Sequence, residues 1–365
     1  VDRSRGLGDV YKRQEVDYMH FRTEESMLSA FLQYWNENYP DVITGWNVQL
    51  FDIPYIARRV TRILGEKAAK SLSPWKLISS REIYIKGRKQ IAYDLPGIST
   101  LDYLELYRKF TYTNQESYRL DHICLVELGE RKLDHSEYDT FKEFYEKNWQ
   151  KFIEYNIHDV RLVDKLDDKM KLLDLAFTMA YDAKVNYEDV FSQVRMWDNY
   201  IYCELNKRKI AIPPKRDALK DAKYAGAYVK EPKAGRYDWV VNFDLNSLYP
   251  HLIMQYNISP ETLTDDRHPT VTVDRILQQE VDIDGDLAVC ANGAQYRKDV
   301  QGFLPLMMQK MYDSRVIFKK KMIKAKQQYE KTPTVELMKE IARCNNIQMA
   351  KTVSYTHLRA HETYP

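Results

Sequence analysis

Apolar side chains recur every three to four positions in several long stretches of the chain, and this spacing predicts helices with one buried face. In residues 24–39 the pattern is carried by Met27, Leu28, Phe31, Leu32 and Trp35. The same spacing predicts helices over residues 54–64, 140–156, 160–180, 190–209, 310–331 and 336–351. Pro333 marks the end of the sixth of these seven helices and separates it from an antiparallel return helix.

Short runs of β-branched and aromatic residues predict strands between these helices. Residues 41–46 form one such run, and residues 83–98 predict two paired strands around the turn Lys86-Gly87-Arg88. Residues 287–297 predict a hairpin, because Asn292-Gly293 supplies the positive φ angles of a tight turn. The chain is therefore expected to have a mixed α/β (α+β) fold, and its 365 residues predict two or three domains.

Composition narrows this picture only slightly. With 44% hydrophobic residues the chain can bury a sizeable core, but no apolar run approaches the roughly 20 residues of a membrane span. The net charge of +2 does not itself indicate a nucleic-acid partner, so local clusters must carry that argument. Cys124, Cys203, Cys290 and Cys344 are far apart, which indicates reduced thiols in a cytoplasmic protein.

One carboxylate stands at the end of a short apolar strand, Val240-Val241-Asn242-Phe243, and is followed by Leu245-Asn246-Ser247-Leu248-Tyr249-Pro250. This carboxylate is Asp244. An acid at the end of a buried strand is costly unless a cation meets it, and a divalent metal is the usual cation. Asp is also a common turn residue, so an ordinary turn remains the simpler interpretation of Asp244 alone.

A second group of acids lies nearer the start of the chain. Asp52 stands two residues before Pro54, at an expected helix start, and by itself it reads as a helix cap. Tyr155 and Asp159 are four residues apart and therefore share one helix face. An Asp can hold a metal while a Tyr hydroxyl orients a water, as two-metal phosphodiester hydrolysis requires.

The stretch around Asp244, together with Asn257-Ile258-Ser259-Pro260-Glu261-Thr262, resembles the first palm motif of family B DNA polymerases in the T-even-type phage branch. The resemblance implies that Asp244 and the carbonyl of Leu245 bind the two catalytic Mg²⁺ ions, which Mn²⁺ can replace. It also implies that the Leu245 carbonyl and the amides of Ser247 and Leu248 hold the triphosphate. Tyr249 would be a steric gate against ribose 2′-hydroxyl groups, and His251 stands where the family has a small residue.

The stretches around Asp52 and Asp159 resemble the second and third motifs of the 3′–5′ proofreading exonuclease of the same family, an RNase H-like domain. The resemblance implies that both acids are metal ligands, that Tyr155 positions water, and that Asn47 and Phe51 contact the frayed 3′ end. The first motif, an Asp-x-Glu pair, is missing upstream of Asp52, and we attribute this to truncation.

Two further segments carry DNA and nucleotide chemistry. In residues 224–232, small residues stand between two tyrosines. They permit close approach of the backbone to a phosphate chain, although a strand bulge is the simpler interpretation. This segment resembles the family's template-gripping element and implies DNA contacts from Tyr224, Gly226, Tyr228 and Lys230.

The basic helix at 310–331 carries Arg315 and Lys319 on one face, where both can meet a triphosphate. They match fingers residues of the family, while the other lysines there are expected to form a solvated face. Lys351 is a weaker candidate, since the family's second fingers motif would begin at or just after it.

The resemblance covers residues 15 to about 352. Residues 1–14 and 353–365 resemble translated sequencing-adapter sequence and are expected to be non-native tails, although ordinary disordered tails are the alternative. We expect the exonuclease domain at 15–182, a helical connector at 183–215, the first, antiparallel part of the palm at 216–301 and truncated fingers helices at 302–352.

These observations predict a fragment, inactive by itself, of a replicative DNA-directed DNA polymerase with a 3′–5′ proofreading exonuclease. Its partners would be primer-template DNA, deoxynucleoside triphosphates and a sliding clamp, without a membrane, in the cytoplasm of a host cell. Two alternatives stay open. One is a stand-alone RNase H-like 3′–5′ exonuclease with an unrelated C-terminal domain, and the other is a non-catalytic DNA-binding module.

Overall fold

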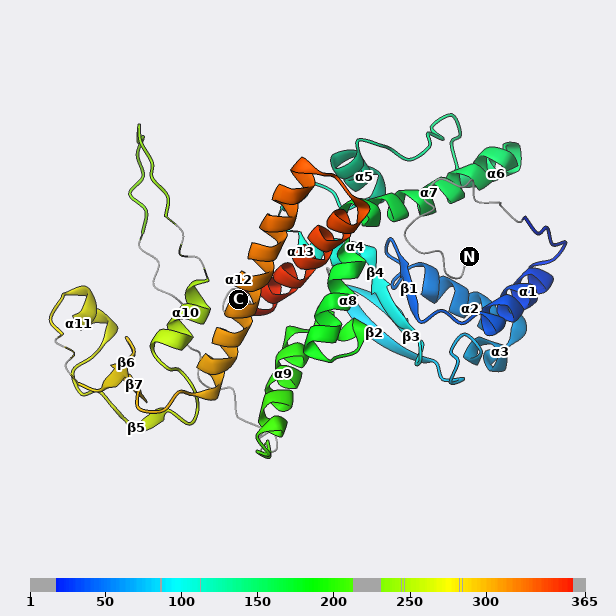
Figure 1. Ribbon diagram of the computed structural model, residues 1–365. Coiled ribbons are helices and arrows are strands. Elements are labelled where there is room, and N and C mark those ends of the chain that lie inside the picture. Colours follow the sequence, from blue (N-terminus) through cyan, green and yellow to red (C-terminus); the bar gives the residue numbers. More distant parts are fainter. Residues whose placement is uncertain are drawn as a thin grey trace. The chain divides into compact units, whose positions relative to one another are not determined.

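The computed structural model describes residues 18–85, 87–111, 113–212, 231–243, 245, 247–281, 283 and 285–356. The chain divides into two compact units, Val1–Asp102 and Tyr103–Pro365, and each is described by itself. Helices and strands are interspersed along the chain, as labelled in Figure 1. This confirms the expected α/β class. The domain boundaries expected at 182, 215 and 301 remain predictions.

In its described residues, the first unit packs three helices with two small sheets. Its elements are α1 (Glu24–Glu37), β1 (Val42–Gly45), α2 (Asp52–Leu64), α3 (Glu66–Lys70), β2 (Ser79–Ile85), β3 (Arg88–Asp94) and β4 (Ser99–Asp102). Strand β1 pairs in parallel with β4, and β2 forms an antiparallel hairpin with β3. The core is built from the apolar faces of α1 and α2, including Leu28, Leu32, Ala57 and Val60. The expected helix at 24–39, strand at 41–46 and strand pair within 83–98 are confirmed, although β2 starts earlier.

The first half of the second unit is helical. Its elements are α4 (Tyr103–Phe110), α5 (Leu120–Leu128), α6 (Phe141–Lys147), α7 (Trp149–Met170), α8 (Leu172–Ala183), the short 3₁₀ helix η1 (Tyr187–Phe191) and α9 (Gln193–Lys207). The break expected between residues 156 and 160 is wrong, because α7 continues through it. The breaks lie instead at Asn148, whose side chain caps α7 by accepting from the Lys151 amide, and at Lys171, which has a φ of +55°.

The second half contains α10 (Leu248–Gln255), β5 (Leu263–Arg267), α11 (Val273–Leu277), β6 (Leu287–Val289), β7 (Ala294–Arg297), α12 (Phe303–Lys331) and α13 (Val335–Thr356). The three strands form an antiparallel sheet in the order β5-β7-β6. The predicted hairpin is therefore confirmed, with Gly293 at a φ of +80°. Figure 1 shows α12 and α13, in orange and red, as an antiparallel pair.

The strand predicted to lead into Asp244 is wrong for the residues described. Residues 231–243 contain no strand, and Trp239 and Phe243 are 93% and 87% exposed. A strand is stabilised by backbone hydrogen bonds to a neighbour, and no described segment pairs with this one. An apolar run without such a neighbour has no sheet to join.

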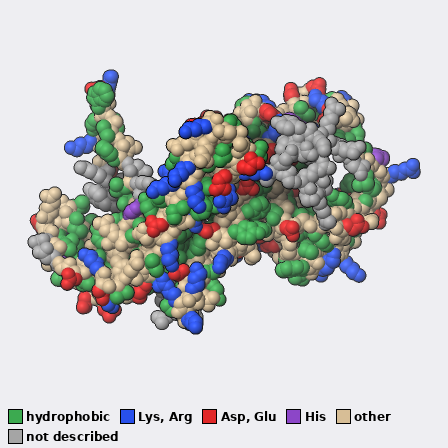
Figure 2. All heavy atoms as spheres, in the orientation of Figure 1, with side chains coloured by type: hydrophobic (Ala, Val, Ile, Leu, Met, Phe, Trp, Pro, Cys, Tyr) green, Lys and Arg blue, Asp and Glu red, His purple; other side chains and the backbone are tan. Residues whose placement is uncertain are grey.

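Helix α12 begins at Phe303, seven residues before the predicted start, and α13 continues to Thr356 with Val353 buried. In Figure 2 the Lys and Arg side chains follow the course of α12, as its basic sequence leads one to expect. The four cysteines are free. Among the described residues, no helix is both long and apolar enough to cross a membrane.

Candidate functional site

Asp159 and Tyr155 lie on one face of α7, as their spacing predicted, and both contact Lys132. The Lys132 ammonium donates to Asp159 Oδ2 at 2.6 Å and to the Tyr155 hydroxyl at 3.1 Å. Burial lowers the pKa of Lys132, but these two hydrogen bonds outweigh it and raise the pKa above the ordinary lysine value. Lys132 therefore stays charged and fixes both side chains.

The second oxygen of Asp159 is different. Oδ1 is buried and has no hydrogen-bond partner in the described part of the chain. A buried carboxylate oxygen without a partner is costly, and a divalent cation removes that cost. Asp159 therefore fits a metal ligand, although no cluster of three acids, histidines or cysteines occurs within the residues described.

The ring of Tyr155 is held in an aromatic enclosure. His135, Phe141 and Phe144 meet it edge-on, with ring centroids 5.3, 5.8 and 6.0 Å away. Because these side chains surround the ring, they hold its hydroxyl toward Lys132. Sequence reasoning missed Lys132 and His135, which stand in an irregular segment with no periodic pattern to mark them.

Asp52 is the first residue of α2, in the first unit. Partial desolvation raises the pKa of its carboxyl group, although its own backbone amide lowers it. Asp52 and Asp159 belong to different units, so the prediction that they converge on one metal centre stays a prediction.

The turn that leads into Asp52 is anchored by Asp102, which is 2% exposed. Its two carboxylate oxygens accept from the amides of Asn47, at 2.9 Å, and Gln49, at 3.0 Å. Asn47 has a φ of +67°, a conformation that Asn adopts more readily than most residues. Asp102 thus positions the segment that carries the predicted DNA contacts Asn47 and Phe51.

The predicted polymerase residues are described only in part. Asp244 lies outside the described residues, as do Tyr224, Gly226, Tyr228 and Lys230. Leu245 is 68% exposed. Ser247, with a φ of +57°, immediately precedes α10, which carries Leu248 and the half-buried Tyr249.

Helix α10 packs on α12, the helix that carries Arg315 and Lys319. The unusual residue His251 makes one of these contacts, since its ring meets Tyr312 edge-on with centroids 4.9 Å apart. Arg315 is half-buried and Lys319 is exposed. The helix that carries Leu248 therefore packs against the helix that carries Arg315 and Lys319, and all three residues are predicted to bind the triphosphate.

The first turn of α12 is capped from outside the helix. Gly302 has no capping side chain, and Asn257 Oδ1 accepts from the Gly302 amide at 2.9 Å while Glu261 accepts from the Phe303 amide at 2.5 Å. A Cβ atom on Gly302 would lie 2.5 Å from Ser259 Cβ, so glycine permits this close approach. The segment 257–262, noted as a sequence motif, is thus the cap of α12.

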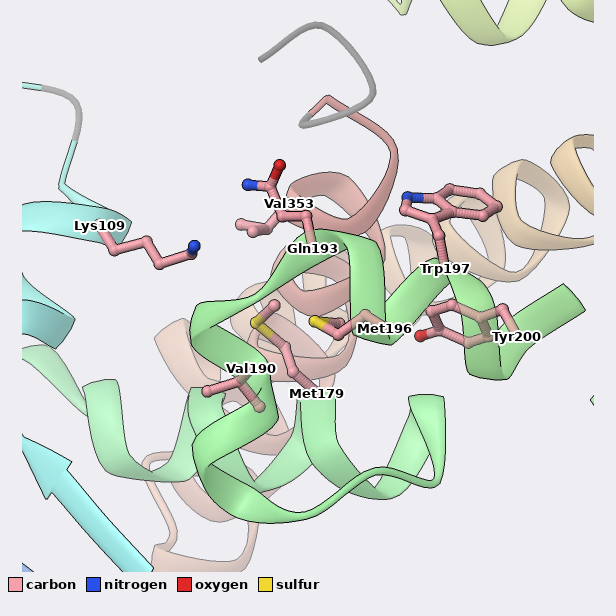
Figure 3. A pocket seen from close by; sticks show the side chains of 8 residues that line it. All are labelled: Lys109, Met179, Val190, Gln193, Met196, Trp197, Tyr200 and Val353. Atoms are coloured by element: carbon pink, nitrogen blue, oxygen red, sulfur yellow. The ribbon is translucent and has the colours of Figure 1, made fainter. Parts of the chain in front are cut away.

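Lys351 does not stand free for a nucleotide. Its ammonium lies 3.0 Å from Asp182 Oδ1, and Tyr200 donates to Asp182 Oδ2 at 2.7 Å. Tyr200 also lines a pocket of about 240 Å³, a volume that includes open solvent. Figure 3 shows its lining by Lys109, Met179, Val190, Gln193, Met196, Trp197, Tyr200 and Val353. The mainly apolar lining contains none of the predicted site residues and suits helix packing.

Comparison with known proteins gives two family matches. Residues 6–123 match the model described as DNA polymerase family B, exonuclease domain, and residues 192–338 match the model described as DNA polymerase family B. The second match argues against a stand-alone exonuclease with an unrelated C-terminal domain.

Similar curated proteins include two phage enzymes, each named DNA-directed DNA polymerase. The protein of Escherichia phage RB69 is 39% identical over 88% of this chain and 36% of its own length. That of Enterobacteria phage T4 is 35% identical over 86% of this chain and 35% of its own length. DNA polymerase 1 of Sulfolobus acidocaldarius is 31% identical over 71% of this chain and 30% of its own length. The chain thus spans about a third of the length of these relatives.

Proposed function

The chain belongs to DNA polymerase family B, and from this premise we propose that the protein containing it extends DNA primers and excises mismatched 3′ ends. Its substrates would be primer-template DNA and deoxynucleoside triphosphates, with a sliding clamp as partner and the host cytoplasm as location. The observation that carries the proposal is the arrangement of Lys132, Tyr155 and Asp159, in which one buried carboxylate oxygen is left open.

For excision, we assign Asp159 and Asp52 as the ligands of divalent metal, Mg²⁺ or Mn²⁺. A metal ion bound there would supply an activated water and neutralise charge on the phosphate. Lys132 donates to the Tyr155 hydroxyl and so occupies one of its lone pairs. The hydroxyl proton is then left to donate to the attacking water or to a phosphate oxygen at the 3′ end.

For synthesis, we assign Asp244 and the Leu245 carbonyl to the metal, and the amides of Ser247 and Leu248 to the triphosphate. Arg315 and Lys319 would meet the negative charge that grows on the phosphates during transfer. The packing of α10 on α12 supports this assignment, because it joins the helix that begins at Leu248 to the helix that carries Arg315 and Lys319.

The test is a chimera in which residues 15–352 replace the matching segment of the phage RB69 polymerase. Asp159→Asn should lose excision of a mismatched 3′ end and keep primer extension, while Asp244→Ala should do the reverse. Each loss should be about a thousandfold or more, because a metal ligand is removed. Extension by the Asp244→Ala chimera at the level of the unaltered chimera would overturn the polymerase assignment.

A further inference from the structure

Two large aromatic side chains lie exposed at the start of α2. Phe51 is 65% exposed and Tyr55 is 59% exposed. Their rings are nearly parallel, with an interplanar angle of 12° and centroids 6.5 Å apart. Ile53, Ala57 and Val60 bury the opposite face of the helix in the core, so packing does not account for the two rings.

Two arginines continue the same face. Residues 51, 55, 58 and 62 follow the helical spacing of one stripe, and Arg58 and Arg62 are both exposed. Neither forms an ion pair with any residue that the structure describes. Glu24 is paired with the neighbouring Arg59 and also feels the charge of Arg62. The stripe therefore presents two rings followed by two cations that are available to a ligand.

We propose that this face of α2 binds single-stranded DNA, with Tyr55 stacking on a base beside Phe51 and with Arg58 and Arg62 contacting phosphates. Aromatic faces accept any base, and guanidinium groups complement the charge of the strand. The stripe is about 16 Å long at the helical rise, which suits a short extended strand. The inference rests on the proposed function, since it extends the binding of the 3′ end beyond Phe51 to three further residues.

The strand would also have a direction. Asp52, the proposed metal ligand, stands beside Phe51 at the start of the stripe, while the arginines lie toward the end of α2. The reacting 3′ terminus therefore belongs at Phe51, and the upstream nucleotides run along Tyr55 toward Arg62.

The test measures binding of a fluorescent single-stranded 12-mer to the full chain by anisotropy, with EDTA present so that no cleavage occurs. Tyr55→Ala should weaken binding about tenfold or more, and Tyr55→Phe should restore it, because the ring supplies the stacking. Arg58→Ala should weaken binding and reduce the slope of log K against log salt by about 0.7. Matched controls are Tyr84→Ala, at a tyrosine 69% exposed on β2, and Arg81→Ala, at an arginine paired with Asp94.

Equal affinity of the unaltered chain and a folded Tyr55→Ala variant would overturn this inference alone. Failure of the unaltered chain to bind the 12-mer would also overturn this inference, whereas the proposed excision is tested separately by the Asp159→Asn chimera. If Tyr55→Ala dissociated a dimer in sedimentation experiments and left DNA affinity unchanged, the face would belong to a second copy of the chain, and the inference would be wrong.

Discussion

Lys132 binds Asp159 through one oxygen only: its ammonium lies 2.6 Å from Oδ2, while the buried Oδ1 has no hydrogen-bond partner among the described residues. The carboxylate is thus oriented before any metal arrives, by a side chain that also holds Tyr155. A ligand oriented in advance loses less conformational freedom when it binds.

We predict that Lys132→Met in the RB69 chimera reduces excision about 10- to 100-fold, because groups that orient metal ligands have effects of this size. Primer extension should not change. The control is Lys165→Met, at a lysine of α7 that pairs with Glu130 on the surface. Rates of 3′-end excision from a mismatched primer decide the matter, and an unaltered rate in the folded Lys132→Met protein would contradict the prediction.

Asp102→Ala should destabilise the chain by about 2–4 kcal/mol, because the amides of Asn47 and Gln49 both lose a buried acceptor. Asp102→Asn should cost less, since it keeps one carbonyl oxygen. Urea unfolding followed by circular dichroism gives these free energies. Asp94→Ala removes an exposed ion pair with Arg81 and should cost at most about 1 kcal/mol. Equal losses of unfolding free energy for Asp102→Ala and Asp94→Ala would show that the hydrogen bonds to Asp102 do not stabilise the chain.

Glu261 predicts a pH dependence. Partial burial raises the pKa of its carboxyl group, but hydrogen bonds from Ser259 and the Phe303 amide outweigh burial, so the folded pKa lies below the ordinary value. A lowered carboxyl pKa adds stability above the unfolded pKa, about 4.3, and this stability is lost as the pH falls through the folded pKa. Glu261→Gln should therefore melt at a lower temperature than the unaltered chain at pH 7.

This difference in melting temperature should shrink as the pH falls below about 4. Glu280→Gln, at an exposed glutamate of the same unit, is the matched control and should leave the melting temperature at pH 7 unchanged. A difference that is the same at pH 7 and pH 3 would mean that the charge of Glu261 does not stabilise the cap.

Tyr249→Ala in the chimera should relax sugar selection by roughly tenfold to a thousandfold, about 1.4 to 4 kcal/mol, if the ring excludes a 2′-hydroxyl group by steric overlap. The measurement is kcat/KM for matched ribo- and deoxynucleotides. Tyr256→Ala, at the C-terminal end of α10, is the control. A tyrosine that only packs would give equal losses for both substrates, and an unchanged ratio in a folded variant would remove Tyr249 from the site.

The sequence predicted what local periodicity controls. The apolar spacing in 24–39 and the turn at Gly293 correspond to α1 and to the β6–β7 hairpin, and Tyr155 and Asp159 share a face because four residues make about one turn. Helix ends were less predictable. The break at Lys171 depends on one residue with a positive φ, which no pattern announces.

Contacts between distant segments could not be predicted in this way. Lys132 meets Asp159 across 27 positions, and Asp102 meets Asn47 across 55. Such pairs depend on how elements pack, and a single sequence carries no signal for them. The strand predicted at residues 240–243 was wrong for a related reason, since a strand depends on a neighbouring strand that lies elsewhere in the chain.

The cap formed by Asn257 and Glu261 fixes the N-terminal end of α12, so any tilt of this helix would pivot there. Its first turn is tied to the segment that follows α10, while its 29 residues extend about 44 Å from that point. A rotation of about ten degrees at the base would displace Arg315 by about 3 Å and the far end by about 8 Å. A rotation too small to break the cap would thus move Arg315 and Lys319 by distances that increase with their separation from Gly302.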